Sequence, residues 1–122
     1  MKYLNSYTSP DGETHIEELD STLAPADFIP GTPLIDLSAP HSATTVVFAR
    51  LVAGWFGDYH PSPRRQFAIT LTGEAEVLTS DGQKRVITPG TIWLIEDTHG
   101  KGHQTRVSEK GDWTIVLIGL QD

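Results

Sequence analysis

The segment His60-Pro-Ser-Pro-Arg-Arg-Gln66-Phe-Ala-Ile-Thr-Leu-Thr-Gly73 opens with a histidine, turns through two prolines and enters a short stretch that glycine ends. Aromatic and β-branched residues between such turn residues are typical of a strand, which we predict over 66–72. A period-two alternation predicts a second strand over 74–79. Asp81-Gly82 follows it, and this dipeptide supplies the positive φ angles of a tight hairpin, so a return strand is predicted over 83–88.

The same pattern continues on both sides of this hairpin. Downstream we predict strands over 91–95, 103–108 and 112–120, with a loop over 96–102. The run over 91–95 is apolar on both faces and is therefore predicted to be central in a sheet. Upstream, the β-branched run over 44–53 predicts a strand that ends at a glycine. Many short strands, glycine and proline turns, and the lack of a helical pattern predict an all-β sandwich or jelly-roll barrel.

The first 43 residues differ in composition from the rest of the chain. They are rich in Pro, Ser, Thr and Asp, and their apolar runs are short. We predict that residues 1–43 form an N-terminal arm, with one or two edge strands packed on a barrel formed by residues 44–122 of the same single domain. The window over 14–19 is too short to distinguish a strand from one helical turn.

Composition excludes several function classes. The chain of 122 residues has no cysteine, which excludes disulfides, thiolate metal sites and cysteine nucleophiles. The net charge is −7 and the nine basic residues are mostly scattered, so nucleic acid is not an expected partner. No run approaches the ~18 apolar residues of a membrane span, and no apolar signal segment opens the chain, so we expect a cytoplasmic protein. Neither a serine nucleophile elbow nor a phosphate-binding glycine loop is present.

The segments 63–77 and 80–82, together with Pro89-Gly90 and Glu96-Asp-Thr-His-Gly-Lys-Gly-His103, resemble those of small single-domain cupins. The resemblance covers roughly residues 46–118. The stretch Gly12-Glu-Thr-His15 is similar to the start of a bacterial subgroup of that family. The resemblance implies a double-stranded β-helix, which is a barrel of the jelly-roll type, preceded here by the N-terminal arm.

The first cupin motif, G-x5-H-x-H-x(3,4)-E-x6-G, can be laid on the chain residue by residue. Gly54, His60 and Gly73 stand in register, whereas Ser62 replaces the second histidine and Gln66 replaces the glutamate. In the second motif His103 matches the last histidine, and Val107 stands where the motif has asparagine. Two of the four metal ligands usual in this family, which are three histidines and one glutamate, are therefore replaced.

The resemblance implies a divalent transition metal, such as Fe, Mn, Ni, Cu or Zn, and no organic cofactor. His60 and His103 would supply imidazole nitrogens and Gln66 an amide oxygen, which binds more weakly than a carboxylate. A metal without an anionic ligand keeps its full charge and favours an anionic, oxygen-bearing substrate. In the alternative, the three side chains are hydrogen-bonded polar groups that line a metal-free binding cavity.

Other side chains near these positions are candidates for substrate binding and catalysis. The doublet Arg64-Arg65 would orient an anionic substrate, or else forms a solvated turn. Trp55 and Tyr59 are candidates for lining a pocket beside His60. Asp97 and His99 are candidate acids or bases, with a turn residue and a surface residue as the alternatives.

Strand alternation predicts what surrounds this site. If Gln66 faces inward, Ala68 and Thr70 do so too and leave room for a ligand, while Phe67 and Ile69 face an opposing packing layer.

Two functions fit these expectations. One is a metal-dependent enzyme, an oxygenase, isomerase or lyase of cupin type, acting on a small anionic metabolite. The other is a barrel that binds a small molecule without transforming it. The resemblance also implies a homodimer formed through an edge sheet, with the hydrophobic strand Val46–Ala53 as the candidate edge.

Overall fold

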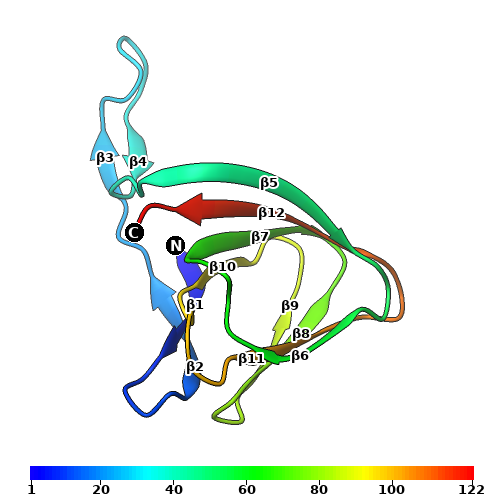
Figure 1. Ribbon diagram of the computed structural model, residues 1–122. Helices are drawn as coiled ribbons and strands as arrows, with labels where there is room; N and C mark the ends of the chain where they lie inside the picture. Colours follow the sequence, from blue (N-terminus) through cyan, green and yellow to red (C-terminus); the bar gives the residue numbers. More distant parts are fainter.

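A computed structural model describes all residues, 1–122, and consists of strands joined by turns and loops (Figure 1). The predicted all-β class is confirmed. The chain contains no helix, and therefore no helix that is long and apolar enough to cross a membrane. The strands are β1 (Lys2–Thr8), β2 (Thr14–Asp20), β3 (Ala24–Ala26), β4 (Ile35–Leu37), β5 (Ala43–Leu51), β6 (Phe56–His60), β7 (Gln66–Thr72), β8 (Ala75–Thr79), β9 (Lys84–Ile87), β10 (Ile92–Ile95), β11 (His103–Val107) and β12 (Trp113–Leu120).

The eight strands from β5 to β12 form two facing sheets in nested pairs. β8 pairs with β9, β7 with β10, β6 with β11 and β5 with β12, all antiparallel. One sheet has the order β10-β7-β12-β5 and the other the order β6-β11-β8-β9. This nesting is the strand order of a jelly roll, so the predicted jelly-roll architecture is confirmed.

The N-terminal residues add two hairpins to this barrel. β1 pairs in parallel with β10, with Leu4 opposite Trp93, and β2 pairs with β1, which extends the first sheet to six strands. The window over 14–19 is thus a strand. β3 and β4 pair only with each other and project from the barrel (Figure 1). β10 lies between β1 and β7, as its apolar sequence predicted.

The core lies between the two sheets. Trp93 and Trp113 are both 2% exposed, and each buried indole nitrogen donates a hydrogen bond, to Ser6 Oγ at 2.9 Å and to Thr70 Oγ1 at 3.0 Å. These bonds satisfy polar groups that would otherwise be buried without a partner.

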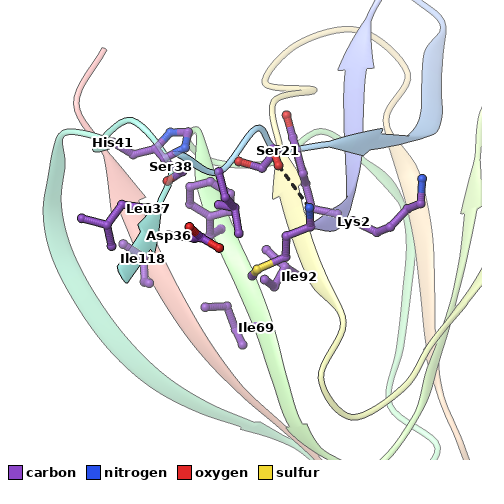
Figure 2. A pocket seen from close by; sticks show the side chains of 13 residues that line it. Lys2, Ser21, Asp36, Leu37, Ser38, His41, Ile69, Ile92 and Ile118 are labelled. Carbon is purple, nitrogen blue, oxygen red and sulfur yellow. Dashed lines mark hydrogen bonds between the residues drawn. The ribbon is translucent and has the colours of Figure 1, made fainter. Parts of the chain in front are cut away.

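The alternation along β7 places its residues as predicted on the inner side of the barrel. Ala68 and Thr70 are 2% and 1% exposed there. On the outer side Phe67 and Ile69 are half-buried, and the His41 ring packs edge-on against Phe67 with ring centroids 5.0 Å apart. Phe67 and Ile69 also line an open groove on the outside of the six-stranded sheet, whose other side is formed by residues 36–41 (Figure 2).

Candidate functional site

A cavity of about 130 Å³ opens between the two sheets. Its walls include three tryptophans and several aliphatic side chains, and its polar groups come from three segments. Those polar residues are His60, Ser62, Gln66, His103 and Thr105. Such a mixture of apolar wall and few polar groups is typical of a small-molecule site.

The two histidines of the cavity are brought together by strand pairing. His103 on β11 lies directly opposite His60 on β6, and their ring centroids are 5.1 Å apart. His60 Nδ1 lies 3.0 Å from the Pro61 carbonyl oxygen, and His103 Nδ1 lies 2.6 Å from Asp97 Oδ2. A carbonyl oxygen only accepts, so His60 carries its hydrogen on Nδ1, and the carboxylate favours the same tautomer in His103. Nε2 is left without a hydrogen-bond partner in both rings.

Asp97 lies behind His103 and is fully buried. Its Oδ1 accepts a hydrogen bond from Ser6 Oγ at 2.9 Å, and its Oδ2 accepts one from Thr14 Oγ1 at 3.3 Å in addition to that of His103. Three donors from three strands therefore meet one carboxylate. Asp97 does not line the cavity, so it acts on the site by orienting the His103 imidazole.

Gln66 begins β7 and points into the cavity. Its Nε2 lies 3.4 Å from Ser62 Oγ, which itself donates to the Arg64 carbonyl at 2.7 Å. The amide nitrogen is thus turned toward Ser62, and Gln66 Oε1 has no partner within the chain.

Two glycines allow the segments of the site to approach each other. A Cβ built on Gly102 would lie 2.1 Å from the His60 carbonyl carbon and oxygen, so only glycine lets β11 start against the end of β6. A Cβ on Gly57 would lie 2.7 Å from the Trp55 ring and 3.2 Å from His60 Nε2. The missing side chain at Gly57 therefore makes room for the Trp55 ring and the imidazole.

The structure places the remaining predicted site residues in different surroundings. Trp55 lines the cavity, whereas Tyr59 and His99 are exposed and do not. Arg64 donates to Thr44, Thr45 and the Leu120 carbonyl. Arg65 forms an ion pair with Glu96 at 2.9 Å. Neither arginine lines the cavity. The structure thus brings together His60, Gln66, His103 and Trp55.

Several lining residues were not predicted. Trp113, Ile115 and Leu117 line the cavity from β12, and their period-two spacing at the end of the chain was a signal that could have identified them. Ser6 and Thr14, which hold Asp97, carry no such signal because 91 and 83 residues separate them from it.

The donor set suits a metal only in part. No group of three or more His, Cys, Asp or Glu side chains is placed to hold a metal ion. Two imidazoles with free Nε2 atoms are available, and Gln66 Oε1 is a possible third donor. Metal-binding histidines characteristically donate their other ring nitrogen to a carboxylate or a backbone carbonyl, which is the arrangement of both rings here.

Asp58 on β6 is an exposed carboxylate that does not line the cavity. Hydrogen bonds from the Gln104 side chain and the Tyr59 backbone amide hold the pKa of Asp58 below its ordinary value. This carboxylate therefore stays charged at neutral pH.

Comparison with known proteins finds distant similarity to solved structures. No protein-family model matches the chain. No curated protein matches it either. Among solved structures, a protein of Neisseria meningitidis is 18% identical, covering 62% of this chain and 72% of its own, with a TM-score of 0.46. A conserved protein of unknown function from Streptococcus pyogenes is 14% identical, covering 70% and 71%, with a TM-score of 0.48. A cupin domain from Bordetella pertussis is 15% identical, covering 84% of this chain and 96% of its own, with a TM-score of 0.49.

Proposed function

We propose that this chain is a small cupin that binds a divalent transition-metal ion through Nε2 of His60 and of His103, and that it transforms a small organic molecule in the same cavity. The observation that carries the proposal is the hydrogen bonding of the His60 and His103 imidazole rings. Each Nδ1 is hydrogen-bonded to an oxygen and each Nε2 has no hydrogen-bond partner, and the two ring centroids are 5.1 Å apart. Imidazole nitrogen suits the divalent ions of iron, nickel, copper and zinc.

Gln66 would complete the donor set through its amide oxygen. When bound, such a metal supplies a Lewis acid with open positions for a substrate oxygen. A cavity of about 130 Å³ limits the substrate to a small molecule, and most of the residues that line it are apolar. Because no carboxylate lines the cavity, an anionic substrate would meet no like charge there.

A second candidate is a barrel that binds a small molecule without transforming it. The observation that favours it is the absence of Asp, Glu, Lys and Arg from the cavity lining. The histidines are the remaining acid–base groups, and a metal bound at both Nε2 atoms would occupy the nitrogens needed for proton transfer. Turnover would then depend on protons from the substrate or from solvent.

Metal binding tests the proposal directly. Protein purified without a metal-chelating tag, titrated with Zn²⁺ or Ni²⁺ in a calorimeter, is expected to bind one ion per chain. His60→Ala and His103→Ala should each weaken binding on the order of 100-fold, or ~2.7 kcal/mol. His99→Ala is the matched control, because that histidine is exposed outside the cavity. Binding that both site variants leave unchanged would contradict the assignment. No binding by the wild type, with stabilisation by small carboxylates alone, would favour the second candidate.

Replacing Gln66 by Glu tests whether the Gln66 side chain is a metal ligand or has only a structural role. We expect Gln66→Glu to tighten Zn²⁺ binding by roughly tenfold, since a carboxylate is the stronger ligand for the ion. Without metal the same change should lower the free energy of unfolding by about 1–2 kcal/mol, because it places a charge in a largely apolar cavity. Thermal unfolding with and without Zn²⁺ measures both effects. An unchanged affinity would place Gln66 outside the coordination sphere.

A further inference from the structure

Ser6 connects the N-terminal strand to the cavity between the two sheets. It lies on β1 beside Ile95, the last residue of β10, and the backbone amide of Glu96 donates to its carbonyl oxygen at 2.8 Å. Its side chain is 0% exposed, although β1 belongs to none of the nested pairs of the barrel. The hydroxyl therefore reaches the interior at the point where β10 ends and the loop before His103 begins.

The hydroxyl of Ser6 bonds two side chains, and only one arrangement of hydrogens satisfies both. An indole nitrogen only donates, so Ser6 Oγ accepts from Trp93 Nε1 at 2.9 Å. The single hydroxyl hydrogen is left for the carboxylate of Asp97, whose Oδ1 lies 2.9 Å away. Ser6 thus holds the indole and the carboxylate together.

Both partners of Ser6 contact His103. Asp97 Oδ2 lies 2.6 Å from His103 Nδ1, and the Trp93 ring meets the imidazole edge-on with ring centroids 5.2 Å apart. Trp93 and His103 line the cavity, whereas Ser6 does not. We call Ser6, Trp93, Asp97 and His103 the buried quartet. It joins a hydroxyl outside the cavity to an imidazole and an indole that form part of the cavity wall.

The other bonds of Asp97 do not replace the bond from Ser6. Oδ1 has no second partner, and Thr14 Oγ1 lies 3.3 Å from Oδ2, the oxygen that His103 already uses. Without Ser6 both remaining bonds would lie at one oxygen, and the carboxylate could turn about its Cβ–Cγ bond. The direction of Oδ2, and with it that of the imidazole, would then be less well defined.

We infer that Ser6 is a positioning residue of the site, which holds Nε2 of His103 toward the cavity through its bonds to Asp97 and Trp93. The N-terminal strand is then a part of the site that the eight strands of the barrel alone do not supply. The effect of Ser6 on affinity rests on the proposed function, since the metal would be bound by His103. Replacing a residue that orients a metal-binding histidine typically costs about 10- to 100-fold in affinity.

Titration with Zn²⁺ in a calorimeter measures the effect on binding. Ser6→Ala should weaken binding about tenfold, the lower end of that range, because Ser6 acts through Asp97. Thr70→Val is the matched control. Thr70 is 1% exposed and does not line the cavity, and its Oγ1 accepts from the indole of Trp113, a wall of the cavity, at 3.0 Å. This variant frees the same kind of indole N–H but leaves Asp97 untouched, so its affinity should match that of the wild type.

Nuclear magnetic resonance of the metal-free protein reports the positioning itself. The Nδ1 hydrogen of His103, bonded to Asp97, should give a resolved imidazole resonance in the wild type and in Thr70→Val. Ser6→Ala should shift this resonance upfield and broaden it, because a carboxylate held less firmly makes a weaker charge-assisted hydrogen bond. The indole resonance of Trp113 should stay in place in Ser6→Ala and shows that the barrel around it is intact.

Two results would overturn the positioning role of Ser6. An unchanged His103 resonance in Ser6→Ala would show that the imidazole does not depend on this hydroxyl. Equal losses of affinity in Ser6→Ala and Thr70→Val would trace the effect to the freed indoles instead. If Ser6→Ala does not fold, Ser6→Cys takes its place, because a thiol fills the position and donates only weakly.

The same measurements separate this role from the proposed function. If His60→Ala weakens Zn²⁺ binding while Ser6→Ala does not, the metal site stands and the positioning role is wrong. If the wild type does not bind Zn²⁺, the proposed function fails, and the His103 resonance alone decides whether Ser6 positions the imidazole.

Discussion

Replacing Asp97 by alanine is expected to lower the free energy of unfolding by about 3–5 kcal/mol, because several buried hydrogen-bond donors lose their acceptor at once. The carboxylate is fully buried and accepts hydrogen bonds from His103, Ser6 and Thr14. Its removal leaves three buried donors without a partner. Urea unfolding followed by tryptophan fluorescence measures the loss.

Asp97→Asn distinguishes the structural role of this residue from its effect on the site. An amide oxygen in the place of Oδ2 can keep the bonds from His103 and Thr14, and the amide fills the same volume, so we expect a loss of only about 1–3 kcal/mol. Affinity for Zn²⁺ should still fall about 10- to 100-fold, because a neutral amide fixes the His103 ring and raises its basicity less than a carboxylate does. Asp58→Asn is the control, since that carboxylate is exposed. An Asp97→Ala protein as stable as the wild type would show that His103 is held by other contacts.

Among substitutions that add one methyl group at the site, Gly102→Ala should lower the free energy of unfolding most. Gly102 has φ of +80°, and an added Cβ would lie 2.1 Å from the carbonyl carbon and oxygen of His60. Backbone cannot move aside as a flexible side chain can, so we expect a loss of more than about 4 kcal/mol, in the range reserved for severe backbone effects.

Gly82→Ala supplies the matched comparison for this prediction. Its φ is +90°, yet nothing lies within 4 Å of the added Cβ. The left-handed conformation alone should then cost about 1–2 kcal/mol. Chemical denaturation of the two variants side by side isolates the contact with His60. Equal losses would mean that the β6–β11 junction can relax, and that His60 and His103 do not depend on this close approach.

Local turn chemistry explains why much of the barrel could be predicted. The strand over 66–72 coincides with β7, and the Asp81-Gly82 turn joins β8 and β9 as expected. β6 was not predicted, because Phe56–His60 is short and mostly exposed and its alternation is weak. β1 was missed as well, since its place beside β10 depends on a parallel pairing that no local pattern encodes.

The site was predictable only where its residues follow a spacing. His60 and Gln66 were identified from motif register, and β7 alternation placed Ala68 on the inner side with Gln66. The bonds that orient His103 join Asp97 to Ser6 and Thr14, which come from the other end of the chain. The directions of Arg64 and Arg65 depend on the turn before β7 and on partners near residues 44, 96 and 120, which the sequence around them does not specify.

The nested pairing of strands also determines the order in which the barrel can assemble. Closing the β8–β9 hairpin brings together neighbouring residues, whereas each outer pair closes a longer loop at a greater entropic cost. During synthesis β1 and β2 are made first, yet the strand that β1 joins ends at Ile95. The hydrogen bond between Ser6 and Asp97 therefore cannot form until Asp97 has been synthesised. Until then the hairpin of β1 and β2 has no sheet to join. Such a topology, rich in contacts between distant residues, favours folding in milliseconds to seconds rather than microseconds.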